Sequence, residues 1–506
     1  MKSLINLKRA ATGLLTLSLL GLLASCSLTE EPYSSFNTET LYTTAGGAEL
    51  GLVAAYSPLN SLYYGPAALI VSDWSSDQTY PRAVVGRNTL TLFNYDPNYT
   101  TQKSNNRLFE SPQYIWQNCY AGIEKANQVL DRVPAATMDE NRKKVILAEA
   151  RFLRAFYHWM LTKNFGDVVI KTTASISEEA AVVGTSPRAD VYKQIFADLD
   201  VAVPNLPSGP AATRKGSASQ EAALALYAKA ALYAGEYTLA RDKAQQVIAS
   251  GKYSLLTNVY DVYDVSKEDA ARVENIWAFE GERALESQVF GSGPNSFANG
   301  LHGPPNSAGP AYGRGTFGSS FAYQSFFNSF SPLDKRRTLL DTTYVNVAGV
   351  RVRQRNITPV TTQGVLVRKY QDPNSVGANN SCNIPILRMA DVYLIAAEAE
   401  ARANGPATAY GYINTVRTRA GLPDLAPGLS QTEFVEAVLQ ERSWELFAEG
   451  DRWYDLTRTD KFLTVIPTAV NNVYPARSPQ PKHKYFPIPQ DEINANPKVM
   501  QNPAWR

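Results

Sequence analysis

Residues 441–458 read Glu-Arg-Ser-Trp-Glu-Leu-Phe-Ala-Glu-Gly-Asp-Arg-Trp-Tyr-Asp-Leu-Thr-Arg, a run that mixes charged and large aromatic side chains at helical spacing. Glu441, Glu445 and Glu449 recur every four residues and so form one stripe along a helix. Like charges at this spacing destabilise an isolated helix. The stripe is therefore expected to meet cations in the folded chain.

Three arginines of the same run are the expected cations: Arg442, Arg452 and Arg458. Gly450 is expected to end the helix, as a C′ glycine does. Two interpretations compete, a ligand or catalytic site and a set of ion pairs that locks the fold. Because buried charges are usually paired, we favour a structural ion network. Its expected members are Glu441, Arg442, Glu445, Glu449, Arg452 and Arg458.

The amino terminus predicts the compartment. Lys2, Lys8 and Arg9 precede the apolar stretch 10–24, which is shorter than the roughly 20 residues of a membrane-spanning helix. This pattern is typical of a signal peptide over residues 1–25. It ends in Leu-Ala-Ser-Cys, which resembles a bacterial lipobox, so we expect lipidation at Cys26. The alternative is a plain signal peptide with a chance cysteine. Residues 26–39 are polar and are expected to form a tether.

Charge and cysteine content exclude several classes of protein. Removal of residues 1–25 takes away three of the 49 basic residues and none of the 47 acidic ones, which leaves the mature chain nearly neutral. Such a chain has no electrostatic footprint for nucleic acid. Besides Cys26 the chain has only Cys119 and Cys382, too few for a disulfide framework. Cys119 is in phase with apolar neighbours and is expected to be a buried free thiol.

Apolar residues at helical spacing dominate the rest of the chain and predict a mostly α fold. The expected helices cover 40–62, 113–131, 142–164 and 188–203. Two further pairs, 219–234 with 237–250 and 388–404 with 407–420, carry alanines where two helices would cross. These resemble tetratricopeptide-type pairs, although their spacing is irregular. We expect one domain over 40–506, with its helical scaffold at about 40–250 and 386–506.

The middle region, about 251–385, lacks the helical period. Glycine, serine, proline and asparagine dominate 291–320, and short strand-like runs follow near 345 and 366. A long glycine-rich loop inside a compact protein is often functional. We therefore expect a variable, loop-rich, ligand-binding region with short strands.

Five further motifs occur in a fixed order. They are 148–155 followed by Asn164-Phe165-Gly166-Asp167, then 334–337 (Asp-Lys-Arg-Arg), 387–392 (Leu-Arg-Met-Ala-Asp-Val), 413–422, and the closing segment that begins at Pro487. Together with 441–458 they resemble the SusD/RagB family of outer-membrane nutrient-binding lipoproteins. The resemblance implies a lipid-anchored protein of the outer membrane, facing outward, with a SusC-like TonB-dependent transporter as partner and a glycan (an oligosaccharide or polysaccharide) as ligand.

No catalytic set is evident in the sequence. The three histidines, His158, His302 and His483, have no metal-like spacing, and we expect neither a metal nor another cofactor. Gly313, Gly315 and Gly318 match a dinucleotide pattern by letter but do not lie between a strand and a long helix. A glycosidase would need two carboxylates in one cleft. We expect no enzymatic activity, with a hydrolase as the less favoured alternative.

A sugar site needs aromatic rings for the apolar faces of the sugar and polar groups for its hydroxyls. By position, two loops are expected to supply them. The expected ligand contacts are Asp73, Trp74, Tyr80 and Arg82 in the first loop, and Phe297, His302, Tyr312, Arg314 and Phe317 in the second. Trp74 is expected to be exposed. The alternatives are capture of a peptide or other nutrient by the same architecture, and a helical-repeat adaptor for a protein ligand.

Overall fold

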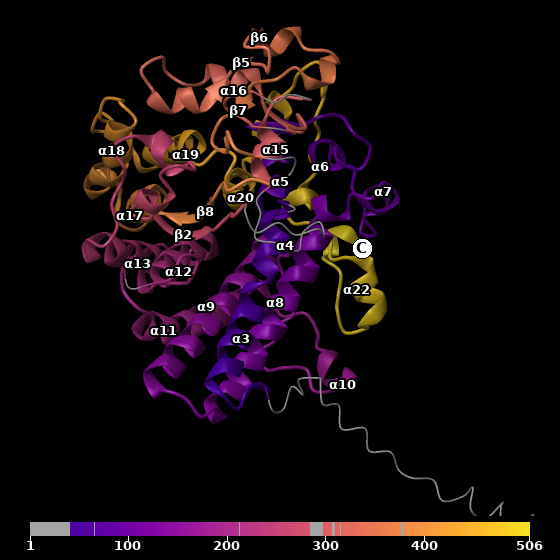
Figure 1. The fold of residues 1–506 in the computed structure, drawn as a ribbon, viewed down its shortest axis with the longest axis vertical. Helices are drawn as coiled ribbons and strands as arrows, with labels where there is room; N and C mark the ends of the chain where they lie inside the picture. Colours follow the sequence, from indigo (N-terminus) through magenta and orange to yellow (C-terminus); the bar gives the residue numbers. More distant parts are fainter. Residues whose placement is uncertain are drawn as a thin grey trace, which may run out of the picture. The chain divides into compact units, whose positions relative to one another are not determined.

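In the computed structural model, the described residues are 41–64, 66–211, 213–283, 297–305, 309–313, 315–375 and 379–506. Cys26, the signal peptide and Arg314 lie outside them. Figure 1 shows the chain as a mostly helical structure with a few short strands, as predicted. Residues Tyr42–Arg506 form one compact unit. None of the helices in the described part of the chain has the length and apolarity needed to cross a bilayer.

Long helices pack in chain order as neighbouring pairs. The contacts run from α8 (Pro112–Arg132) to α9 (Glu140–Phe165), α11 (Arg188–Ala202), α12 (Gln220–Ala234) and α13 (Tyr237–Ser250). The array then passes from α13 directly to α17 (Met389–Asn404), which packs on α18 (Tyr410–Arg419) and α19 (Gln431–Glu445). The middle region is thus an insertion into a continuous array of helices (Figure 1).

Local signals fix the ends of these helices. Ser219 caps the amino terminus of α12, and Gly235 ends it in the left-handed conformation (φ 87°). At α19, Ser430 and Glu433 form a reciprocal capping box. The single helix predicted over 40–62 is instead two helices, α3 (Ala45–Tyr56) and α4 (Pro58–Tyr64). Pro58 begins the second helix because proline suits the first helical turn and disrupts a helix interior.

The array buries an alanine-rich core between α17, α18 and α19. Ala390, Ala397 and Ala401 face Ile413, Val416 and Phe434 across it. Small side chains let the helices approach closely, as the sequence predicts. Both Cys119 and Cys382 are free and buried.

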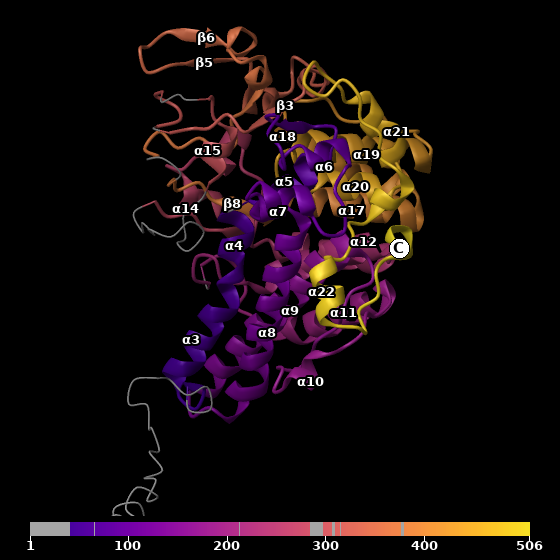
Figure 2. The ribbon, with the colours of Figure 1, turned by 90° about the vertical axis from the view of Figure 1, so that its right-hand side faces the viewer.

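The middle region contributes short antiparallel strand pairs. β2 (Asn275–Phe279) pairs with β8 (Ile384–Arg388), which joins the two ends of the region. β1 (Thr79–Pro81) pairs with β3 (Ser320–Ala322), β4 (Leu340–Asp341) with β7 (Leu366–Val367), and β5 (Thr343–Val345) with β6 (Arg351–Arg353). Figure 2 shows the middle region on one side of the helices, with the β5–β6 hairpin at its edge.

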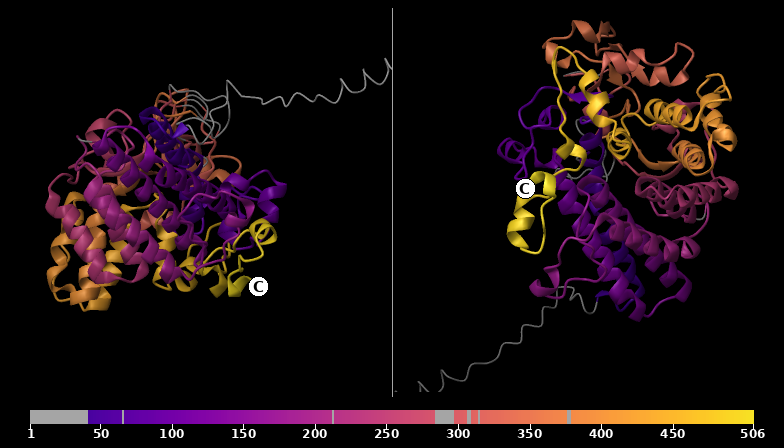
Figure 3. Two further views of the ribbon diagram at one scale, coloured as in Figure 1. Left: turned by 90° about the horizontal axis from the view of Figure 1, so that it is seen from below. Right: turned by 180° about the vertical axis from the view of Figure 1, so that it is seen from behind.

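Short helices complete the fold. They are α5 (Ala67–Asp73), α6 (Thr89–Leu92), α7 (Thr100–Ser104), α10 (Glu178–Ala181), α14 (Glu268–Ala271), α15 (Ala298–His302), α16 (Gln324–Asn328), α20 (Arg452–Arg458), α21 (Phe462–Val465) and α22 (Gln490–Ala495). The carboxyl-terminal segment returns beside the amino-terminal helices (Figure 3). There the Phe486 N–H donates to the Asn164 carbonyl, and the Tyr99 hydroxyl donates to the Pro487 carbonyl.

Candidate functional site

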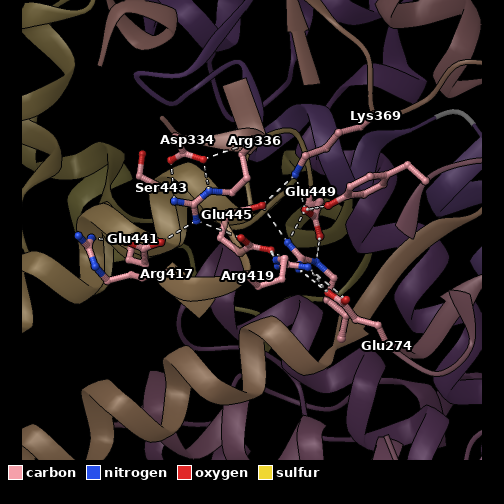
Figure 4. Close-up of polar contacts among 12 residues, drawn as sticks. Glu274, Asp334, Arg336, Lys369, Arg417, Arg419, Glu441, Ser443, Glu445 and Glu449 are labelled. Atoms are coloured by element: carbon pink, nitrogen blue, oxygen red, sulfur yellow. Dashed lines mark hydrogen bonds and ion pairs between the residues drawn. The ribbon is translucent and has the colours of Figure 1, made fainter. Parts of the chain in front are cut away.

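The glutamate stripe lies in the interior, where several cations surround it (Figure 4). Glu445 contacts Arg336 at 3.0 Å, Arg388 at 2.6 Å and also Arg419. Glu449 pairs with Lys369 at 2.6 Å and with Arg388 at 2.8 Å. The charges are thus held within the protein and closed to solvent.

The predicted pairing of this stripe with Arg442, Arg452 and Arg458 is wrong. Arg442 pairs with Asp391 and Asp455, at 2.6 and 2.8 Å. The other two arginines also point elsewhere, Arg452 to Asp77 and Arg458 to Glu398 and Asp455. The stripe instead receives cations from far along the chain, since Glu441 pairs with Arg336 and Arg417. Arg336, Arg388, Arg417 and Arg419 belong to the motifs at 334–337, 387–392 and 413–422, so separate motifs converge on one cluster.

The predicted helix end is also wrong. α19 stops at Glu445, and residues 446–450 form turns before α20 begins at Arg452. Glu449 therefore reaches the cluster from a turn. Gly450 has φ 81°, and a Cβ there would lie 2.8 Å from the Ala68 carbonyl oxygen. The glycine lets this turn contact α5 rather than ending α19.

The arginines and the lysine of this cluster shift the pKa values of Glu445 and Glu449. Burial alone would raise the pKa of Glu445, but Arg419, Arg388 and Arg336 outweigh it and hold that pKa well below its ordinary value. The pKa of Glu449 is lowered against burial in the same way, by Arg388 and Lys369. Such carboxylates are poor proton donors and have no access to a substrate. The geometry is that of a structural network.

Five of the predicted ligand contacts are buried: Asp73, Trp74, Tyr80, His302 and Tyr312. The expectation that Trp74 is exposed is wrong, because its side chain is 0% exposed and its indole N–H donates to Ser320 Oγ at 3.0 Å. His302 stacks on Tyr370, and burial lowers its pKa to about 3. The Tyr312 carbonyl accepts a hydrogen bond from Ser375, which ties this loop to the core. Tyr80 lines a cavity described below, whereas the other four side chains support the surface rather than form it.

Three of the predicted residues do meet at the surface. Arg82, Phe297 and Phe317 line one cavity of about 630 Å³. The two phenylalanine rings stack with centroids 5.3 Å apart, and Phe317 is 38% exposed. The Arg82 guanidinium donates to the Phe317 carbonyl at 3.4 Å, which joins the two predicted loops.

Further lining residues were not predicted from the sequence, and most of them belong to the segment 105–110. They are Arg87, Asn105, Asn106, Arg107, Phe109, Glu110 and Ser319. Asn105 and Asn106 are exposed and present side-chain amides at the rim. The run Asn-Asn-Arg before Phe109 is the signal that could have identified this loop, since amides and guanidinium groups beside an aromatic ring suit a polyhydroxylated ligand.

A buried layer supports the cavity. The Arg87 guanidinium lies 5.4 Å from the Trp74 ring and donates to Glu110 at 3.0 Å. Arg107 lies 3.7 Å from the same carboxylate. Glu110 is the one carboxylate among the described lining residues, and these two cations engage it. The resulting site is an aromatic wall with amide and guanidinium donors around it.

The comparisons with known proteins agree with this architecture. A laminarin-binding SusD-like protein superposes with a TM-score of 0.75 at 24% identity, over 91% of this chain and all of that one. A SusD homolog from Bacteroides thetaiotaomicron superposes with a TM-score of 0.79 at 21% identity, over 92% and 98% of the two chains. The fold is therefore that of the SusD-like helical proteins.

The sequence comparisons identify the family. The model described as the SusD family matches residues 258–505, and the one described as "Starch-binding associating with outer membrane" matches residues 59–232. The SusD-like protein P25 of Formosa agariphila is 29% identical over 94% of this chain and 95% of its own. The starch-binding protein SusD of Bacteroides thetaiotaomicron is 24% identical over 78% of each chain. The chain belongs to the SusD/RagB family, as the motifs predict.

Proposed function

We propose that this protein binds a glycan in the cavity lined by Phe317, Phe297 and Arg82. The observation that carries the proposal is the stack of the exposed Phe317 on the half-buried Phe297, beside amide and guanidinium groups. Sugar rings have apolar faces edged by hydroxyls. Aromatic rings cover such faces, and Asn and Arg side chains bond the hydroxyls. Relatives named for binding laminarin, laminarihexaose and starch support a glycan as the ligand.

We propose further that the protein is anchored by a lipid on Cys26, faces the cell exterior, and passes its glycan to a SusC-like TonB-dependent transporter. The lipobox-like sequence at residues 22–26 supports the anchor. Family membership and the outer-membrane description of the matching family model support the compartment.

The proposed function is capture without cleavage. Glycoside hydrolysis requires two carboxyl groups across the scissile bond. Among the described residues lining the cavity, only Glu110 is acidic, and Arg87 and Arg107 engage it. The protein is therefore expected to release its ligand intact.

The test is titration calorimetry of the purified protein with laminarihexaose and maltohexaose. Phe317→Ala should weaken binding about tenfold, equal to about 1.4 kcal/mol, because it removes the exposed ring of the aromatic wall. Leu463→Ala is the matched control, since Leu463 is also 38% exposed and lies outside the cavity. Unchanged affinity in Phe317→Ala, or no binding of either glycan, would contradict the proposal. Shortened sugars appearing over time would indicate a hydrolase instead.

A further inference from the structure

A second cavity, of about 540 Å³, lies between the β5–β6 hairpin and a carboxyl-terminal loop. Its walls are Thr342, Thr343 and Arg353–Arg355 on one side and Asn471–Val473 on the other. Tyr80 also lines the cavity, and its hydroxyl donates to the Gln363 carbonyl at 2.9 Å. Among the residues that the structure describes, the two cavities share no lining residue.

The charged side chains that line this cavity are all positive among the described residues. Arg353 and Arg355 both line it and are exposed, and no described lining residue is acidic. Neither guanidinium has an ion-pair partner within the described ranges of the chain. Their neighbour Arg351 differs, because it donates to Thr343 Oγ1 at 3.1 Å and does not line the cavity. Two unpaired cations in one concave surface favour an anionic ligand.

Gln354 supplies a second and independent observation. It lies between the two arginines, is 2% exposed, and lines the cavity. Neither its amide oxygen nor its amide nitrogen has a hydrogen-bond partner among the residues that the structure describes. The Asn471 amide nitrogen across the cavity is unpartnered in the same sense. Buried polar groups are nearly always satisfied, so these amides point to a ligand that brings donors and acceptors.

The backbone holds Gln354 in place. Its N–H donates to the Thr342 carbonyl at 2.9 Å, and the Ile357 N–H donates to the Gln354 carbonyl at 3.2 Å. On the facing wall, Asn471 Oδ1 accepts from the N–H groups of Val473 and Tyr474, which leaves its amide nitrogen as the free donor. Val360, 54% exposed, adds an apolar surface. The cavity thus has fixed amides, two free cations and one apolar wall.

We propose that this cavity binds an acidic saccharide, with Arg353 and Arg355 pairing a carboxylate or sulfate group and Gln354 and Asn471 bonding ring hydroxyls. The inference depends on the proposed function only in taking the ligand to be a saccharide. It adds a second site and a charge requirement that the Phe317 cavity lacks. The proposed ligand is an anionic sugar. Its negative charge comes either from the carboxylate of a uronic acid or from a sulfate ester.

The test uses the purified protein and three probes: tetragalacturonate, a sulfated dextran oligosaccharide, and neutral dextran of the same length. One anionic probe is expected to bind, more weakly at high ionic strength, and neutral dextran is not expected to enter this cavity. The anionic probe that binds identifies the source. Arg353→Gln and Arg355→Gln should each weaken that binding about tenfold, and the double variant should abolish it.

Arg351→Gln is the matched control, since it removes the same charge from the same strand outside the cavity. It should leave the affinity within about twofold. Gln354→Met, which keeps the side-chain volume, should weaken binding while circular dichroism stays unchanged. No binding of either anionic probe, or an equal loss in Arg351→Gln, would overturn the proposal.

Phe317→Ala separates this proposal from the preceding one. It should reduce binding of laminarihexaose or maltohexaose and leave the anionic probe unaffected. If the neutral hexaoses fail to bind while the anionic probe binds and depends on Arg353, the glycan site at Phe317 fails and the acidic-saccharide site stands. If the anionic probe depends on Phe317 and not on Arg353, the acidic-saccharide site fails.

Discussion

Asp73 is a buried carboxyl group at the end of α5 that accepts the Gly450 N–H at 3.2 Å. Burial is the main cause that raises its pKa to about 8, with the charge of Asp451 adding to it and Lys369 opposing it. Asp77, four residues later, is less buried, with 18% of its side chain exposed, and Arg452 outweighs burial and lowers its pKa. The pKa values of the two aspartates are thus shifted in opposite directions. Arg452 pairs with Asp77, whereas Asp73 has no ion-pair partner among the residues that the structure describes.

Asp73→Asn should therefore raise the free energy of unfolding at pH 8. The pKa of Asp73 is higher in the folded state, so between its ordinary value of 3.8 and about 8 the folded state binds more protons and stability falls as pH rises. Asparagine keeps the acceptor and removes this loss, which is on the order of 2 kcal/mol or more. Urea unfolding from pH 4 to pH 8 measures it. Asp77→Asn is the control and should destabilise the protein at pH 8; stabilisation by both variants would contradict the assignment.

At the scale of single elements, the turn between α19 and α20 depends on Gly450. Its positive φ disfavours any other residue, and its Cα faces the α5 backbone without room for a side chain. Gly235, at the end of α12, has a similar φ of 87°, but no atom of the described residues lies within 4 Å of a Cβ there. Substitutions at these two glycines therefore allow the effect of backbone strain to be measured apart from the effect of steric overlap.

Gly450→Ala should lower the free energy of unfolding by about 3 kcal/mol, because strain and a clash with the Ala68 carbonyl act together. Gly235→Ala has the strain alone and should lose about 1 kcal/mol. Thermal or urea unfolding of both variants checks the difference. Equal losses would mean that α5 moves away at little cost.

Much of the helical array was predictable because its signals are local. The alanine spacing of 219–234 and 237–250 and Gly235 give α12 and α13 with nearly correct bounds. The end of α19 was not predictable, because the glutamate period continues past Glu445 to Glu449. What stops the helix is tertiary: Glu449 turns to meet Lys369 and Arg388, and Gly450 contacts α5. Periodicity carries no information about partners so distant in sequence.

The candidate ligand-binding cavity was predictable only in part, for a related reason. Loop position correctly brought Arg82, Phe297 and Phe317 to one cavity. The same reasoning placed Trp74 at the surface, whereas Arg87 and Ser320 hold it inside. An aromatic residue in a loop has the same sequence signature whether it supports a cavity or lines it.

At the scale of the whole molecule, the segment 441–458 joins regions that lie far apart in the sequence. Lys229 on α12 is held 2.8 Å from both Asp391 and Asp451, so it bridges the two parts of the helical array. Tyr454 donates to Asn164 at the end of α9. Arg442 adds the link from α19 to α17 and α20 through Asp391 and Asp455. These contacts explain why motifs spread along the chain occur together.

Arg442→Ala should therefore lower stability by about 3–5 kcal/mol, since it leaves buried carboxylates without their partner. The glycan affinity of the remaining folded protein should be unchanged. Arg402→Ala is the matched control: that arginine is 24% exposed, pairs with Glu398, and should cost about 1 kcal/mol or less. Urea unfolding and calorimetry measure the two quantities. Normal stability with lost glycan binding in Arg442→Ala would show that the network belongs to the ligand site.

The cluster around Glu445 also bears on how the protein responds to heat. Hydration of charged groups becomes less favourable as temperature rises, so the cost of keeping Glu445, Arg388 and Arg336 away from water falls on warming. The stabilisation that each Å² of buried apolar surface contributes levels off over the same temperature range. As temperature rises, the cluster thus contributes a growing share of the free energy of unfolding, compared with the apolar contacts between the alanine-rich helices.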